Sequence, residues 1–111
     1  MSPVVNLGEF EQLILLAILR LGDQAYGVTI RTEISEHAGR TVAPGALYTA
    51  LDRLEDKGLV KSRIGEPTPQ RGGRAKRYFT VTASGAKAIA RAQQAFQRLL
   101  EGLDILRGSH A

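Results

Sequence analysis

The sequence predicts a mainly α-helical fold with a small β-hairpin, and two observations support this prediction. Four separate segments of the 111-residue chain are predicted to be helices, the first apolar at every position over two turns and the others with apolar residues at helical spacing. Between the third and the fourth of these segments the pattern changes to alternation, which is typical of half-buried strands. A chain of this length forms one domain with a modest core, so that burial against a partner contributes noticeably to its stability.

The stretch Ala43–Gly58, which reads APGALYTALDRLEDKG, is predicted to form the central helix. Pro44 suits the first position of a helix, and Gly58 suits the stop because it accepts a left-handed backbone. An apolar stripe indicates one buried face, made of Leu47, Leu51 and Leu54. We expect the opposite face to be exposed and to carry Ala46, Thr49, Ala50 and Arg53, with Tyr48 at its edge.

That exposed face is small near the N-terminus and polar further along, which leaves two interpretations open. A helix that enters the major groove of DNA presents such a face, with its N-terminal residues nearest the base edges. An ordinary amphipathic helix shows the same pattern. Tyr48 either contacts a phosphate or packs at the base of the hairpin, and Arg53 either contacts DNA or forms an ion pair with Asp56 or Glu55.

The first predicted helix follows Leu7, with Glu9 and Glu11 in its first turn, and it ends at Gly22. Leu13–Leu19 is apolar at every position, and a helix that is apolar on all sides is buried on all sides. So small a chain can hardly cover one helix completely from within. We therefore expect a second subunit to cover part of it.

A second helix is predicted over Ala25–Ala38, ended by Gly39. Arg40–Val42 then joins it to the central helix, and two helices linked by so short a turn form a helix-turn-helix. His37 is expected to be a solvated residue near the helix C-terminus, and only His110 accompanies it. No metal site is predicted.

Alternation predicts two strands after Gly58. In LVKSRIG, Val60, Ser62 and Ile64 share one face, and in RYFTVT, Phe79 and Val81 share one face. The loop Glu66–Lys76 contains two prolines and a Gly-Gly pair, which suit an exposed tip. We expect a β-hairpin wing appended to the helix-turn-helix.

Basic residues are concentrated in this hairpin. The segment Lys61–Arg77 has a net charge of +5, whereas the whole chain has +4, so the remainder is slightly acidic. The run Arg71-Gly72-Gly73-Arg74 suits a nucleic-acid backbone or a narrow minor groove, since the glycines let the main chain approach. A solvated charged loop is the alternative. The acidic residues of the central helix are expected to lie away from phosphate.

The last helix is predicted to begin at Thr82 or Ser84 and to run to about Leu106. Its apolar residues form a heptad seam, made of Ile89, Ala92, Phe96, Leu99, Leu103 and Leu106. Such a seam packs either on its own core or on another chain. We favour the second, with the seam against the first helix of a partner subunit.

Residue types that perform catalysis are scarce. The chain has no cysteine, its two histidines lie far apart, and neither a nucleophile–base pairing nor metal-ligand spacing is present. The sequence therefore predicts neither an enzyme nor a cofactor. The lack of cysteine fits a reducing cytoplasm, and the longest apolar run is too short to span a bilayer. We expect a cytoplasmic protein, associated with the nucleoid when it binds DNA.

The chain resembles the PadR-like family of bacterial winged helix-turn-helix transcriptional regulators over about Leu7 to Leu106. The specific part is GALYTALDRLEDKGLV, residues 45–60, followed by RGGRAKRYFTVTASG, residues 71–85. These look like the family's Gly-x-Leu-Tyr…Leu-x-x-Leu-Glu…Gly-Leu core and its basic, Tyr-containing strand that ends in Thr-x-x-Gly. Many members have Pro where this chain has Thr49. The single short C-terminal helix resembles the compact branch of the family.

This resemblance implies a homodimeric repressor that binds a pseudo-palindromic operator, with residues 1–82 as the DNA-binding domain and residues 83–111 as a dimerisation helix. We expect the DNA-binding residues to be Thr41, Pro44, Gly45, Tyr48, Thr49, Arg53, Arg71, Gly72, Arg74 and Lys76. We expect the dimer interface to contain Leu13, Leu16, Ile89, Phe96, Leu99, Leu103 and Leu106. Some members release DNA when a small molecule enters the dimer interface, so the resemblance leaves release by an effector open, although no residue of this chain supports one. The alternative function is a protein-interaction module that binds no DNA.

Overall fold

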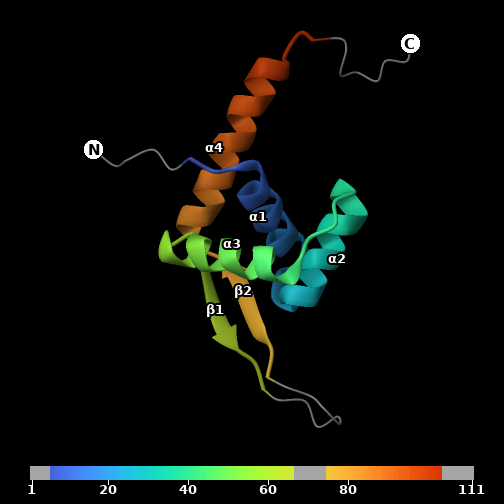
Figure 1. Ribbon diagram of the computed structural model, residues 1–111. Helices are drawn as coiled ribbons and strands as arrows, with labels where there is room; N and C mark the ends of the chain where they lie inside the picture. The colour runs from blue at the N-terminus through green and yellow to red at the C-terminus, as the bar shows by residue number, and fades with distance from the viewer. Residues whose placement is uncertain (1–5, 67–74, 104–111) are drawn as a thin grey trace.

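The computed structural model describes residues 6–66 and 75–103, and it confirms the predicted fold class. Three helices gather at the centre, a hairpin extends from one side of them, and a fourth helix extends from the other side (Figure 1). The elements are α1 (Glu9–Leu21), the short 3₁₀ helix η1 (Gly22–Gln24), α2 (Gly27–Ala38), α3 (Pro44–Asp56), β1 (Val60–Ile64), β2 (Arg77–Val81) and α4 (Ala83–Leu100). None of the helices in these described ranges has the length and apolarity to cross a membrane.

The predicted ends of α1 and α2 are confirmed. Gly22 and Gly39 follow the two helices, and both have positive φ angles, of 62° and 63°. The predicted start of α2 is wrong by two residues, because Tyr26 is extended and forms a bridge with Tyr78 of β2. The backbone N–H of Phe79 also donates to the Ala25 carbonyl, at 2.9 Å. This pairing with the hairpin takes the chain out of the helical conformation.

The central helix α3 begins at Pro44 as predicted. It ends at Asp56, two residues before Gly58, whose φ is +77°. All three leucines of the predicted stripe are completely buried, whereas Thr49 and Arg53 are exposed. The expectation that Ala50 is exposed is wrong, because this residue lies three positions after Leu47 and four before Leu54, on the buried side of the helix.

One apolar core joins all the elements, and its largest side chain, Phe79, comes from β2. Helix α1 packs on α2, α3, β2 and α4 of the same chain. These elements do not bury it on all sides, as we expected of a single small chain, and cover by a second subunit stays a prediction. Leu13 and Leu16 are partly exposed, and the exposed fraction of Leu19 is 50%. The core therefore covers about one side of this helix well and leaves its other side accessible.

The hairpin has the predicted faces. Strands β1 and β2 are antiparallel, with Ser62 opposite Phe79 and Arg63 opposite Tyr78. The first of these pairs lies on the face that contains the buried Phe79, and the second lies on the other face. Most of the predicted loop, residues 67–74, lies outside the described residues. The hairpin thus projects from the core as a two-stranded wing.

Helix α4 begins as predicted, with the Thr82 hydroxyl accepting a hydrogen bond from the Gly85 N–H at 3.1 Å. The expected extension to about Leu106 is wrong. The helix ends at Leu100, because the next residue leaves the helical conformation and Gly102 adopts a φ of +79°. Leu106 itself lies outside the described residues.

Candidate nucleic-acid interface

The outward face of α3 is accessible along its whole length. The side chains of Thr49 and Arg53 lie one turn apart on this face, beyond the small residues at the start of the helix. Five of the residues predicted to contact DNA are exposed positions at the turn and on α3, namely Thr41, Pro44, Gly45, Thr49 and Arg53. The structure therefore brings together on one surface all the predicted residues that precede the hairpin, with Tyr48 at its edge.

Arg53 has no ion pair among the described residues. Of the two carboxylates that the sequence offered as partners, Glu55 is engaged by Arg77, and Asp56 forms no ion pair in the same part of the chain. The alternative of a local ion pair for Arg53 is thus not found among the described residues. Its guanidinium group remains available to an anion that approaches α3.

Tyr48 lies at the edge of this face with an exposed fraction of 38%. Its hydroxyl group lies against Gly27, the first residue of α2, so closely that a Cβ at this glycine would be 2.2 Å from the oxygen. The absence of a side chain at Gly27 therefore allows α3 to lie across the start of α2. Tyr48 ties the two helices of the helix-turn-helix together.

A network of charged and polar groups attaches the inner face of the hairpin to α3. The Nη2 atom of Arg77 lies 2.6 Å from Oε1 of Glu55 and 3.0 Å from Oδ1 of Asp52. The other oxygen of Glu55 accepts hydrogen bonds from the N–H and the hydroxyl of Ser62, at 3.2 and 2.9 Å. The Ser62 bonds and the nearby Arg77 charge hold the pKa of Glu55 below its ordinary value.

This network was not predicted from the sequence, where Arg77 counted only as one of the hairpin's basic residues. A signal was nevertheless present. Asp52 and Glu55 are spaced three residues apart on α3, and alternation places Arg77 on the same face as Phe79, which points at the helices. Because Arg77 is paired, the accessible positive charge of the hairpin is smaller than the sequence indicated.

Aromatic rings and cations line the outer face of the hairpin. The rings of Tyr26 and Tyr78 meet edge to face, with their centroids 5.4 Å apart. The guanidinium carbon of Arg63 lies 4.6 Å from the centroid of Tyr78, and the Lys76 ammonium lies 4.6 Å from that of Tyr26. Lys76, predicted to contact DNA, is thus half-buried at the start of β2. The other predicted residues of the wing, Arg71, Gly72 and Arg74, lie outside the described residues.

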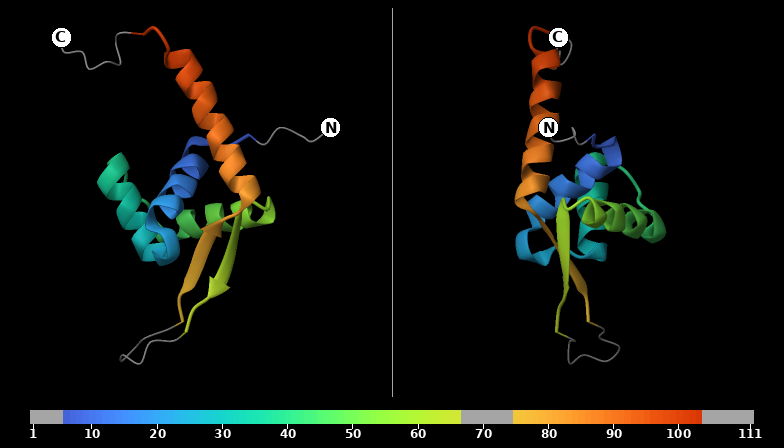
Figure 2. Two further views of the ribbon diagram at one scale, coloured as in Figure 1. Left: turned by 180° about the vertical axis from the view of Figure 1, so that it is seen from behind. Right: turned by 90° about the vertical axis from the view of Figure 1, so that its left-hand side faces the viewer.

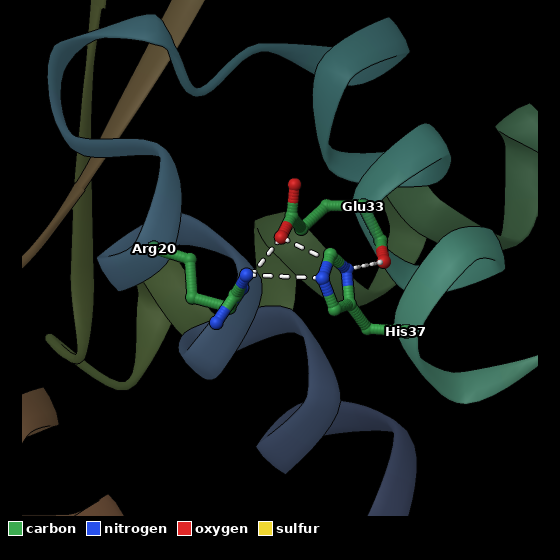
Figure 3. Close-up of polar contacts among 3 residues, drawn as sticks. All are labelled: Arg20, Glu33 and His37. Atoms are coloured by element: carbon green, nitrogen blue, oxygen red, sulfur yellow. Dashed lines mark hydrogen bonds and ion pairs between the residues drawn. The ribbon is translucent and has the colours of Figure 1, made fainter.

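A second polar cluster joins α1 to α2 (Figure 3). Arg20 of α1 contacts Glu33 at 2.5 Å, and its Nη2 atom lies 3.0 Å from Nε2 of His37. Glu33, Glu36 and His37 are close enough together for one cation. The guanidinium group of Arg20 already supplies the positive charge beside two of these three residues, so the cluster is a contact between helices.

Three carboxyl groups give the fold a predicted sensitivity to acid. They are Glu33, Glu55 and Glu11, and the pKa of each is held below the ordinary 4.5. The hydrogen bond from Arg20 lowers the pKa of Glu33, and Ser62 and Arg77 lower that of Glu55. Burial raises the pKa of Glu11, but Lys57 and the Gly8 N–H lower it by more. The folded state therefore takes up protons less readily than the unfolded state. We expect the free energy of unfolding to be constant above about pH 5 and to fall as the pH drops through 4.5 and below.

Chemical denaturation at a series of pH values between about 7 and 3 tests this prediction. The Glu33→Gln variant should lose part of the acid dependence, because one of the three carboxyl groups no longer titrates. A free energy of unfolding that stays constant or rises below about pH 4 would contradict the expectation.

A helix-turn-helix followed by a projecting hairpin defines the winged helix-turn-helix class of proteins. In a comparison with protein families, residues 15–91 match the family described as the Transcriptional regulator PadR-like family. The chain belongs to this family. It is therefore a DNA-binding transcriptional regulator by family, and it is not an enzyme.

Individual relatives agree with this assignment. Transcriptional regulator Rv3488 of Mycobacterium tuberculosis is 35% identical over 79 residues, which are 69% of this chain and 67% of that protein. A PadR family transcription regulator from Clostridium difficile R20291 has a similar structure, with a TM-score of 0.73 and 25% identity over 91% of this chain and 100% of that one. A PadR-like regulator from Bacillus cereus shares the fold, with a TM-score of 0.67 and 20% identity over 90% and 92% of the two chains.

Proposed function

We propose that the protein is a homodimeric repressor that places α3 in the major groove of a pseudo-palindromic operator. The observation that carries this proposal is the accessible face of α3, where small residues at the helix start are followed by Thr49 and by Arg53, which forms no ion pair within residues 6–66 and 75–103. Exposed Gly45 lets the start of the helix approach the DNA backbone closely. The first N–H groups of a helix lack intrahelical partners and attract phosphate.

The proposal assigns different tasks to the two parts of this surface. Thr49 reads a base edge or a thymine methyl group, and Arg53 contacts a phosphate or a guanine. The wing, with Arg71, Gly72, Arg74 and Lys76, contacts the backbone or a narrow minor groove. No small-molecule effector is part of the proposal.

Exposed apolar residues near the end of α4 support the proposed dimer. Phe96 and Leu99 lie on one side of the helix and have exposed fractions of 60% and 80%. Leu103, which follows the end of the helix, is also exposed, at 49%. Ile89, which the sequence also assigned to the interface, is 4% exposed and belongs to the core of its own chain. In the dimer that we propose, this end of α4 packs against α1 of the partner, around the partly exposed Leu13 and Leu16. Such a two-fold pairing presents two α3 helices to successive major grooves, about 34–36 Å apart.

The test is a binding titration of the Thr49→Ala variant on two duplexes, after footprinting of the bound protein has given the operator. At one fixed salt concentration, we expect a loss of about 1–3 kcal/mol on the operator and little loss on a scrambled duplex, because a base contact is removed. Ser84→Ala removes an exposed hydroxyl group of α4 and serves as the matched control, with no expected loss on either duplex.

Two other outcomes would change the assignment. Equal losses of Thr49→Ala on both duplexes would remove Thr49 from the base-reading residues. Wild-type protein that binds no duplex would overturn the proposed function and support a protein-interaction module.

A further inference from the structure

We propose that Glu55 is a positioning residue for DNA binding, which fixes the wing relative to α3, and that Arg77 is its partner and not a phosphate ligand. This inference rests on the proposed function. The DNA-binding surface has two parts, α3 and the wing, and the operator can contact both at once only when the angle between them is fixed. The contacts at the base of the wing show which residues fix this angle.

Glu55 uses both of its carboxylate oxygens to hold the wing. One oxygen receives two hydrogen bonds from Ser62 of β1, and the other contacts Arg77 of β2. The Arg77 side chain is confined further by Asp52, one turn earlier on α3, and by Phe79, whose ring centroid lies 4.9 Å from the guanidinium carbon. Both strands are thus attached to a single side chain of α3.

The attachment also involves the backbone at both edges of the hairpin. The Ser62 N–H donates to Glu55, so a hydrogen-bonding group of an edge strand is held by α3 where it would otherwise face solvent. The opposite edge of the hairpin, along β2, pairs with Ala25 and Tyr26 at the start of α2. The hairpin is therefore fastened along both edges, once to α3 and once to the entry of α2.

Electrostatics distinguishes a positioning role of Glu55 from a role in which it is only a negative charge near the DNA. A carboxylate on a DNA-binding helix repels phosphate, so a variant that only removes negative charge should bind every duplex more tightly. Neutralising Glu55 would also leave Arg77 with Asp52 as its only carboxylate partner among the described residues, so that more of its positive charge would be available to phosphate. If Glu55 positions the wing, its neutralisation should instead weaken binding to the operator.

The experiment compares Glu55→Gln with Asp56→Asn, which changes the same charge at the next position. Asp56 is exposed and forms no ion pair among the described residues. We expect Glu55→Gln to weaken operator binding about tenfold, the size of a lost charged hydrogen bond, and to leave binding to a scrambled duplex unchanged or tighter. Asp56→Asn should bind both duplexes as tightly as wild type or more tightly. Circular dichroism at the assay temperature shows that each variant is folded.

A second variant tests the assignment of Arg77 independently. If Arg77 were a phosphate ligand, Arg77→Gln would reduce the slope of log K against log salt by about 0.9. We expect instead an unchanged slope together with weaker operator binding. A reduced slope, or Glu55→Gln that binds the operator as tightly as Asp56→Asn, would overturn the inference. Wild type that shows no preference for any duplex would overturn the proposed function and this inference with it.

Discussion

Replacement of Gly85 by alanine is expected to destabilise the fold by about 2–3 kcal/mol, the upper range for overpacking. A Cβ at this position would lie 2.1 Å from the Leu59 carbonyl oxygen and 2.8 Å from Cγ1 of Val81. The first contact is with backbone, which cannot rotate away as a side chain does. Either β1 or the first turn of α4 must therefore move.

The surroundings of Gly85 resist such a movement. The Thr82 N–H donates to the same Leu59 carbonyl at 3.0 Å, and the Thr82 hydroxyl donates to the Gly58 carbonyl at 2.6 Å. The Thr82 hydroxyl also accepts the Gly85 N–H, which caps α4. A shift of the helix start breaks these bonds together, so the penalty is not relieved locally.

Gly45→Ala is the matched control for this prediction. Gly45 is also helical, but a Cβ there meets no atom within 4 Å. We expect alanine at this exposed position to stabilise the protein by about 0.5–1 kcal/mol, because it restricts the unfolded chain and favours the helix. Chemical denaturation of both variants measures the difference. Equal free energies of unfolding for the two variants would show that the contact at Gly85 is not close.

Leu99→Glu is expected to convert the proposed dimer into monomers. Leu99 has the largest exposed fraction among the exposed large apolar side chains of the described residues, at 80%. Burial of a leucine contributes about 1.5–3 kcal/mol, and in a two-fold interface each substitution counts twice. A carboxylate in the same place also has to be desolvated. The dissociation constant should rise at least about a hundredfold.

Light scattering during gel filtration measures this effect as a fall in mass from twice 12.0 kDa to 12.0 kDa. Gln94→Glu adds the same charge on the opposite side of α4 and should leave the mass unchanged. A dimer that persists in Leu99→Glu would place the interface elsewhere. Wild-type protein with a mass of 12.0 kDa would refute the dimer itself.

The predictions from sequence succeeded where one chain segment determines its own structure. Helix α3 has a proline at its start and three leucines at helical spacing, and its buried stripe is as predicted. The alternation in the hairpin likewise determined which face carries Phe79. In both segments a periodic pattern indicates one buried side, which can be predicted without knowing the segment that packs against it.

The errors arose where distant segments meet. Tyr26 reads as part of a helix in sequence, but Tyr78, far along the chain, pairs with it and extends the backbone. Arg77 reads as a free positive charge, but α3 supplies two carboxylates to it. Such contacts leave no periodic signal, because each depends on how two elements approach. The prediction for Ile89 failed for the same reason. The core of its own chain covers the first turns of α4, which contain Ile89, and leaves the later part of the seam exposed.

Helix α4 is anchored at one end and extends away from the other elements at the opposite end (Figure 2). Its first turns are fixed in the core through Gly85, Ala88 and Ile89, so the 18-residue helix has no flexible joint where it leaves the core. In a pair of chains joined at Leu99, such a helix behaves as a stiff lever arm. In the proposed dimer, the angle at which each arm meets the partner chain determines the separation of the two α3 helices. The side chains at that contact, far from any base, would then select the length of operator spacer.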